Sequence, residues 1–150
     1  MVGIGYDSHR FAEGRRLVLG GVEIDHPRGL AGHSDADVLA HAVIDAILGA
    51  AGGGDIGTMF PDDDVRWAGA DSIDLLSTVV GTIAGAIVNV DATLICEEPR
   101  LGPYKAEMER KLAEATSARV SVKATSNEGM GWIGRGEGIA CIAVASIASD

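Results

Sequence analysis

Apolar residues follow two periodicities along the chain, alternating in some segments and recurring every three to four residues in others. Alternation or a short apolar run predicts strands at residues 2–9, 17–24, 88–96, 120–126 and 139–149. Within the second of these, Gly20-Gly21 indicates a bulge or a close approach of another backbone.

Three segments have the apolar spacing of helices, each with a start signal. Ser34 is a suitable cap for the first helix, which the glycine triplet at 52–54 ends. Asp71 or Ser72 caps the second, which runs to about residue 86. Pro103 suits the first position of the third, which ends near residue 116. Three loops complete the chain, at residues 25–33, 55–70 and 127–138.

The resulting order, β-β-α-α-β-α-β-β, predicts an α/β (α+β) fold in one small domain spanning residues 1–150. We expect a mixed, mainly antiparallel four-stranded sheet covered by helices, plus a small hairpin. The last strand is apolar on both faces, although one helical layer covers only one face. Ile44 and Leu48 also lie off the main apolar stripe of the first helix. Both features indicate a homo-oligomer in which sheets pack against each other.

Composition and charge narrow the possible functions. A hydrophobic share of 47% excludes intrinsic disorder. The chain has no apolar stretch of roughly 18 residues and no signal-peptide pattern, so we expect a cytoplasmic protein that binds no membrane. Twenty-two acidic residues against 12 basic ones argue against nucleic acid, and a bound phosphate would need metal ions and backbone N–H groups to neutralise it. Cys96 and Cys141 are expected to be buried thiols.

Three residues have the chemistry of a metal centre. Asp7 and His9 are two apart on the first strand, so their side chains leave the same face, and His41 lies within the first helix. A carboxylate and two imidazoles form a zinc site with an open fourth position. Asp37 or Asp45, each four residues from His41, could orient its ring through the distal N–H. A solvated strand end and an ordinary core histidine are the alternatives.

A second polar cluster follows a strand, where Thr125, Ser126 and Glu128 precede a glycine-rich loop. Two hydroxyls and a carboxylate beside exposed amides suit a diphosphate with a hard cation such as magnesium, or merely decorate a turn. His33 and Ser34, before the first helix, could meet an anion at its positive end. The acidic segments 55–57 and 60–64 could hold sugar hydroxyls, or they form a solvated loop.

Five motifs occur in one order: Gly5-Tyr6-Asp7-Ser8-His9-Arg10-Phe11, Gly32-His33-Ser34-Asp35-Ala36-Asp37, Asp55-Ile56-Gly57 with Phe60-Pro61-Asp62, Lys123-Ala124-Thr125, and Gly134-Arg135-Gly136-Glu137-Gly138. Together they resemble the 2-C-methyl-D-erythritol 2,4-cyclodiphosphate synthase family of the non-mevalonate isoprenoid pathway, over nearly the whole chain. The resemblance implies a lyase that converts 4-diphosphocytidyl-2-C-methyl-D-erythritol 2-phosphate to the cyclodiphosphate and CMP, by metal-assisted intramolecular phosphoryl transfer. It also implies a homotrimer with active sites between subunits.

The same resemblance implies the site residues. Zinc would be held by Asp7, His9 and His41, and magnesium or manganese at the substrate diphosphate by Glu128. The catalytic positions that stabilise the transition state would be His33 and Ser126. Substrate contacts would come from Ser34, Asp55, Ile56, Gly57, Phe60, Pro61, Asp62, Asp64, Trp132 and Arg135. The nucleotide pocket would comprise Cys96, Pro99, Arg100, Leu101, Gly102, Ala124 and Thr125.

Five positions depart from the family's usual residues. Ser126 and Asn127 replace threonines, of which Ser126 keeps the hydroxyl, and Arg100 replaces a lysine and keeps its charge with a different geometry. Trp132 replaces a phenylalanine and Ala36 a glycine. Two other functions use the same zinc ligands: a zinc phosphohydrolase that activates water, and a non-catalytic trimeric module with structural zinc.

Overall fold

The computed structural model describes residues 1–148 and contains a five-stranded sheet in the order β4-β1-β7-β5-β6. Its strands are β1 (Val2–Ala12), β4 (Gly29–Leu30), β5 (Ile87–Ile95), β6 (Arg119–Thr125) and β7 (Gly138–Ile147). β5 and β6 are parallel, whereas the other neighbours are antiparallel. The sheet is mixed and mainly antiparallel, as predicted. It has five strands rather than four because β4, within the predicted loop 25–33, pairs with the end of β1. Ser149, the last residue of the final predicted strand, lies outside the described residues.

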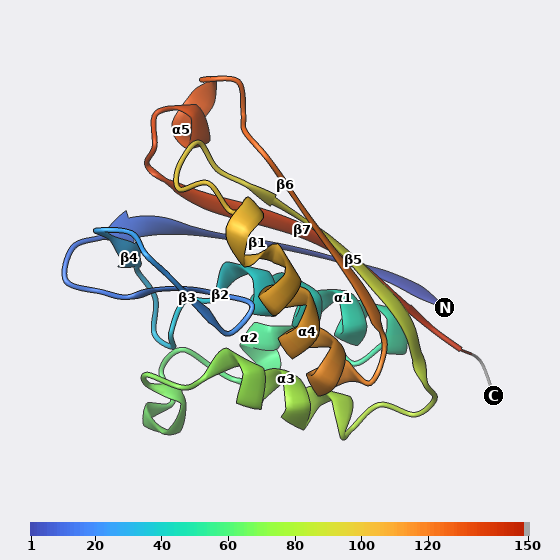
Figure 1. Ribbon diagram of the computed structural model, residues 1–150. Coiled ribbons are helices and arrows are strands. Elements are labelled where there is room, and N and C mark those ends of the chain that lie inside the picture. Colours follow the sequence, from blue (N-terminus) through green and yellow to red (C-terminus); the bar gives the residue numbers. More distant parts are fainter. Residues whose placement is uncertain (149–150) are drawn as a thin grey trace.

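The three longer helices, α1 (Val38–Ala51), α3 (Ser72–Val80) and α4 (Lys105–Thr116), all lie on one side of the sheet (Figure 1). Four single turns occupy predicted loops or precede α4: α2 (Ile56–Met59), η1 (Val65–Trp67), η2 (Gly102–Tyr104) and α5 (Gly131–Gly134). The second predicted helix is too long, because α3 ends at Val80 and the chain then turns towards β5 through Gly85, whose φ is 92°. Within residues 1–148, none of the helices is long and apolar enough to cross a membrane.

The inner face of β1 touches α1 without intervening side chains. A Cβ atom on Gly3 would stand 2.1 Å from the Ala46 carbonyl oxygen, and one on Gly5 would stand 2.0 Å from the Ala42 carbonyl oxygen. The strand backbone therefore lies directly on the helix. Asp7 follows on the same face of the strand, and is brought to the helix at this short separation.

Helix α1 is enclosed by its own chain. Ile44 is 0% and Leu48 1% exposed, because α2 and α3 pack on the side of α1 that faces away from the sheet (Figure 1). The prediction that these two residues mark a subunit interface was therefore wrong. A third layer inside the same chain covers them.

The outer face of the sheet has no such cover among the described residues. On β1, Val2, Ile4 and Tyr6 are 71%, 69% and 55% exposed, and on β7, Ile142 and Val144 are 39% and 38% exposed. The register pairs Ile4 with Val144 and Tyr6 with Ile142, so these side chains form one apolar patch across two strands. The two-faced apolar character predicted for the last strand is confirmed.

Residues 17–24 form a hairpin rather than one bulged strand. β2 (Leu17–Leu19) pairs with β3 (Val22–Ile24), and Gly20-Gly21 is the turn between them. The φ angles of these glycines are 58° and 73°, which fits the type I′ turn that favours glycine.

The cap of α1 is Asp37 and not Ser34. One oxygen of the Asp37 carboxylate accepts from Ala40 N at 3.0 Å, and the two oxygens accept from the Gly20 and Gly21 amides at 2.8 and 2.7 Å. Burial, with a contribution from the charge of Asp35, raises the pKa of Asp37 to about 6. The Asp37 carboxylate thus occupies the N-terminus of this helix.

Candidate active site

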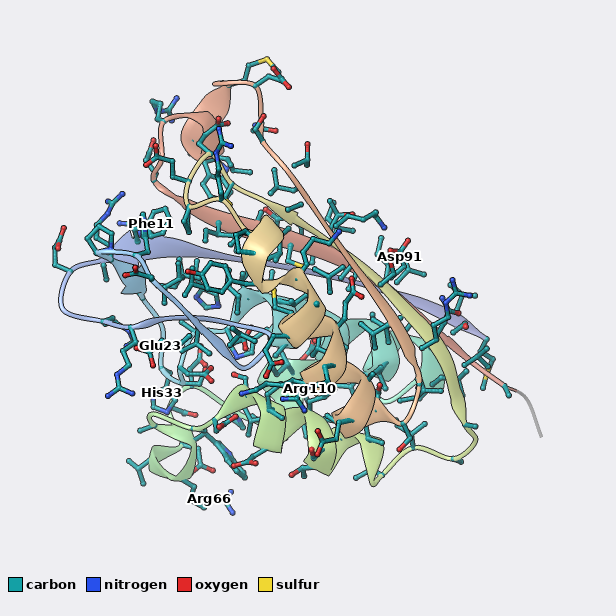
Figure 2. All side chains as sticks on the ribbon, viewed as in Figure 1. Phe11, Glu23, His33, Arg66, Asp91 and Arg110 are labelled. Carbon is teal, nitrogen blue, oxygen red and sulfur yellow. The ribbon has the colours of Figure 1, made fainter. Side chains whose placement is uncertain are left out.

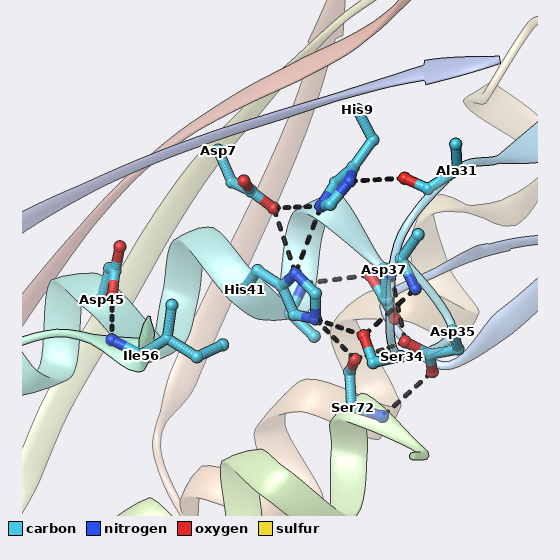
Figure 3. A network of polar contacts seen from close by, with 12 residues as sticks. Asp7, His9, Ala31, Ser34, Asp35, Asp37, His41, Asp45, Ile56 and Ser72 are labelled. Atoms are coloured by element: carbon cyan, nitrogen blue, oxygen red, sulfur yellow. Dashed lines mark hydrogen bonds and ion pairs between the residues drawn. The ribbon is translucent and has the colours of Figure 1, made fainter. Parts of the chain in front are cut away.

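The three predicted metal ligands meet where β1 crosses α1 (Figure 3). Asp7 Oδ2 lies 2.8 Å from His9 Nε2 and 3.1 Å from His41 Nδ1, and the two ring nitrogens are 3.4 Å apart. Nitrogen and oxygen ligands of tetrahedral zinc, at 2.0–2.2 Å from the ion, stand about 3.3 Å from one another. The donor set and its spacing therefore fit a zinc ion.

Both rings are anchored through the nitrogen that faces away from this cluster. His9 Nδ1 donates to the Ala31 carbonyl oxygen at 2.8 Å. His41 Nε2 lies 2.8 Å from Ser72 Oγ and 3.2 Å from Ser34 Oγ. Asp37 and Asp45 were predicted to orient the His41 ring, but neither carboxylate bonds to it. Asp45 instead accepts from Ile56 N at 2.7 Å.

Hydrogen bonds and charge within the triad keep Asp7 ionised, which suits a cation ligand, whereas they favour the protonated form of His9, whose proton a bound cation would displace. Burial acts to raise the pKa of Asp7, but hydrogen bonds from His41 and His9 outweigh it and hold that pKa below its usual value. Burial likewise acts to lower the pKa of His9, but the bond to Asp7 prevails and the pKa is raised. The Asp7 carboxylate consequently stays ionised beside two imidazoles, as a cation ligand must.

The triad lines a cavity of about 350 Å³. Six of the residues expected to serve catalysis or substrate binding line the same cavity: His33, Ser34, Ile56, Gly57, Phe60 and Asp62. The acidic segment is thus partly folded over the metal ligands, because α2 packs against α1.

Three other residues of this segment stand beside the cavity without lining it. Asp55 caps α2, accepting from Thr58 N at 2.7 Å. Pro61 is absent from the cavity wall, and Asp64 forms an ion pair with Arg66 at 2.6 Å.

His33 projects towards the segment that carries Arg66 (Figure 2). Its Nε2 donates to the Asp64 carbonyl at 3.0 Å, so Nδ1 is the nitrogen left to meet a ligand.

The predicted nucleotide residues gather in a second cavity, of about 530 Å³. Its wall includes all seven of them: Cys96, Pro99, Arg100, Leu101, Gly102, Ala124 and Thr125. Ser126 also lines it, so the two expected catalytic residues, His33 and Ser126, lie in different cavities of one chain. The two cavities share no lining residue.

Both cysteines are buried free thiols, as expected. Burial, with a smaller effect of the Glu97 charge, raises the pKa of Cys96 to about 11. Burial also raises the pKa of Cys141, which faces the inner side of the sheet. Neither thiol has the lowered pKa of a nucleophile.

Three expected residues lie apart from both cavities. Trp132 and Arg135 line a third cavity of about 720 Å³, which shares only His9 with the metal cavity. Arg135 Nε pairs there with Glu137 at 2.6 Å. Glu128 is exposed in the loop after β6 with φ at 54°, and lines none of these cavities.

Sequence reasoning missed several contributors to the site. Trp67 and Leu75 line the metal cavity, and Trp67 packs edge-on against Phe60 at 4.8 Å between ring centroids. The sequence pattern indicates Ser72 only as a helix cap. Their roles depend on how the acidic loop and α3 fold over α1, which no local pattern specifies.

An open cluster of one carboxylate and two imidazoles on a cavity wall is the arrangement of metal-dependent enzymes. The chain belongs to the YgbB family, whose sequence model matches residues 1–148.

Proteins of known name agree with this assignment. A 2-C-methyl-D-erythritol 2,4-cyclodiphosphate synthase of Symbiobacterium thermophilum is 56% identical over 154 aligned residues, covering 99% of this chain and 98% of that protein. A bifunctional enzyme IspD/IspF of Anaeromyxobacter sp. is 57% identical, and there the match spans 96% of this chain but 39% of the longer protein. A solved 2C-methyl-D-erythritol-2,4-cyclodiphosphate synthase in a CDP-bound form has a TM-score of 0.88 and 33% identity, covering 99% of this chain and 100% of that one.

Proposed function

We propose that this chain is a 2-C-methyl-D-erythritol 2,4-cyclodiphosphate synthase, a phosphorus–oxygen lyase of isoprene biosynthesis, with residues 1–150 as one catalytic domain. The 56% identity to a synthase of that name, over nearly the full length of both chains, supports the assignment. The observation that carries it is the convergence of Asp7, His9 and His41 in a cavity whose wall includes six further residues expected from the family motifs.

The reaction is an intramolecular phosphoryl transfer. An oxygen of the substrate's 2-phosphate forms a bond to the β-phosphorus of the diphosphate, the bond from that phosphorus to the bridging oxygen breaks, and CMP leaves with the bridging oxygen. The attacking oxygen is already anionic at neutral pH, so no general base is required. Because the nucleophile belongs to the substrate, no protein nucleophile is needed either. The raised pKa values of both cysteines agree with this, since they keep the thiols protonated. Alignment of the two ends of the flexible substrate contributes up to roughly 7–11 kcal/mol.

The net charge of −10 makes cations necessary for a substrate with three phosphates. Asp7, His9 and His41 would hold zinc, and Glu128 would hold magnesium or manganese at the diphosphate. These ions, when bound, neutralise the phosphate oxygens and the developing charge. The chain's own contribution is to orient those ligands and to wall the metal cavity with Phe60, which is buried and so excludes water.

The active site is completed between subunits of a homotrimer. Two observations support this arrangement: the metal cavity and the nucleotide cavity of one chain share no lining residue, and Glu128 lines neither. The nucleotide end of the substrate would then lie against the 96–102 segment of one subunit. Its methylerythritol phosphate end would reach the Ser34 and Asp62 side of the next. The exposed patch of β1 and β7 is the surface on which the sheets meet.

Within this arrangement, His33 and Ser126 act on the transferred phosphoryl group from neighbouring chains. His33 Nε2 is occupied by the Asp64 carbonyl, so Nδ1 is the ring nitrogen that would face a phosphate oxygen. Ser126 would donate its hydroxyl. Trp132 and Arg135 line a separate cavity, so their contact with substrate depends on the assembled trimer.

The test is turnover of 4-diphosphocytidyl-2-C-methyl-D-erythritol 2-phosphate with magnesium, followed by phosphorus NMR. We expect cyclic diphosphate and CMP in equal amounts from the wild type, and none from the His41→Ala variant, which loses one of three metal ligands. In ¹⁸O-labelled water the product should carry no label. Labelled product would identify a zinc phosphohydrolase instead, and absence of any turnover in zinc-loaded protein would indicate the non-catalytic module.

A further inference from the structure

A chain of polar contacts continues behind His41, away from the metal cavity (Figure 3). His41 Nε2 lies 2.8 Å from Ser72 Oγ, and the Ser72 hydroxyl donates to Asp35 Oδ1. Ser72 is 0% exposed and His41 is 9% exposed, so bulk water has little access to these contacts.

The donors and acceptors in the His41–Ser72–Asp35 series of hydrogen bonds follow from the Asp35 end. The Asp35 carboxylate is filled with donors: Oδ1 also accepts from Asp37 N at 3.1 Å, and Oδ2 accepts from Ser72 N at 2.9 Å. An ionised carboxylate has no hydrogen to give, so the single hydroxyl hydrogen of Ser72 goes to Asp35. Ser72 Oγ must therefore accept from His41, which places a hydrogen on Nε2 and leaves the Nδ1 lone pair free.

We propose that Ser72 and Asp35 are positioning residues that fix the His41 tautomer for metal binding through Nδ1. The inference rests on the proposed metal site. It extends that site to Ser72 and Asp35, which are not among the three metal-ligand candidates. His9 has a parallel arrangement, because the Ala31 carbonyl can only accept and so keeps a hydrogen on Nδ1. With zinc bound, both rings would thus offer the cation an unprotonated nitrogen, His9 through Nε2 and His41 through Nδ1.

The contacts from His41 through Ser72 to Asp35, here called the relay, oppose an effect of Asp7 on the His41 tautomer. Asp7 Oδ2 stands 3.1 Å from His41 Nδ1, and in the metal-free protein a carboxylate at this distance favours a hydrogen on Nδ1. That tautomer cannot bind a cation through Nδ1. Ser72 and Asp35 oppose it by offering Nε2 a better-placed acceptor at 2.8 Å. Ser34 is the weaker second contact, because its Oγ is 3.2 Å from Nε2 and also accepts from Ala36 N.

The first test is zinc affinity, measured by competition with a chromogenic chelator. Ser72→Ala should weaken zinc binding by about 10- to 100-fold, the usual effect of removing a partner of a metal-binding histidine. Ser77→Ala is the matched control on the same helix, since its hydroxyl donates only to the Ile73 carbonyl, and it should bind as the wild type does. Ser72→Thr, which restores a hydroxyl, should recover affinity. Chemical denaturation of the metal-free forms separates loss of affinity from loss of folding.

The second test isolates Asp35. If it acts through Ser72, Asp35→Asn should weaken zinc binding in the wild type but change it by less than about twofold in the Ser72→Ala background. Equal effects in the two backgrounds would show that Asp35 does not act through Ser72, and would overturn the relay.

The third test reads the tautomer directly by ¹⁵N NMR of the histidine rings in metal-free protein, at a pH where His41 is neutral. The wild type should carry its hydrogen on Nε2, and Ser72→Ala should shift population to Nδ1. A wild-type ring with its hydrogen on Nδ1, or unchanged zinc affinity in Ser72→Ala, would overturn the proposal while leaving the metal site intact. A wild type without zinc affinity would overturn both.

Discussion

The direct contact between β1 and α1 makes Gly5 the most sensitive backbone position near the metal centre. In Gly5→Ala, the new Cβ would stand 2.0 Å from the Ala42 carbonyl oxygen and 2.7 Å from Ala46 N, whereas ordinary contacts of a Cβ begin at 3.4 Å. Both obstacles are backbone atoms, so no side-chain rotation relieves them. Strand and helix must move apart by about 1 Å or more.

A separation of this size would spoil the metal site. Asp7 is on β1 and His41 on α1, so their 3.1 Å contact opens with the strand. Zinc ligand distances tolerate about 0.2 Å. We therefore expect zinc affinity to fall by more than tenfold and turnover by roughly 100-fold, the effect that a 1 Å misplacement can have. Overpacking should also lower the free energy of unfolding by about 1–3 kcal/mol.

The assays are chelator competition for zinc, phosphorus NMR for turnover, and urea denaturation of the metal-free protein. Gly81→Ala is the matched control, because Gly81 has an ordinary φ of −64° and its Cβ would stand 3.4 Å from the Thr78 carbonyl oxygen. It should be neutral or stabilise by about 0.4–1 kcal/mol. A Gly5→Ala variant with wild-type zinc affinity and stability would refute the claim that this close packing positions Asp7.

Three further outcomes are expected. Arg15 donates to two carbonyls of the 32–34 loop, at 3.0 and 2.8 Å, so Arg15→Ala should lower kcat about tenfold, while the exposed Arg16→Ala should not; equal kcat values would contradict this. Ile4→Asp puts a charge in the exposed apolar patch and should dissociate the proposed trimer in sedimentation; an unchanged mass would contradict the proposed interface. Because the pKa of Cys96 is raised from 9.0 to about 11, iodoacetamide should modify it at pH 8 about 100-fold more slowly than an ordinary thiol, faster as the pH rises; an ordinary rate would refute its buried position.

Local spacing predicted part of the metal triad that the structure brings together. Asp7 and His9 share a face because strand side chains alternate, whatever the rest of the fold does. The glycines at 52–54 end α1 because Gly52 adopts φ 70°, a conformation that the residue type itself favours. Motif order along the chain identified the family, and the family model confirms it.

Where two neighbouring residues suit the same local role, the sequence could not predict which of them takes it. Ser34 and Asp37 both suit a helix cap, and Asp37 takes the role because the Gly20-Gly21 turn packs against it and supplies two further donors. Ser34 is then free to face His41. Ala36 stands between them with φ at 57°, a left-handed conformation that glycine adopts more readily than alanine.

The sequence by itself determined which side chains are candidates for the chemistry and which strand or helix carries the three metal-ligand candidates, because those properties depend on residue type and on spacing over a few positions. The tertiary structure decided what stands behind them. Ser72 reaches His41 across 31 residues, and the layer of α2 and α3 rather than a second subunit buries Ile44. Such contacts depend on how layers pack in three dimensions, and the hydrophobic pattern records only that a face is covered, not what covers it.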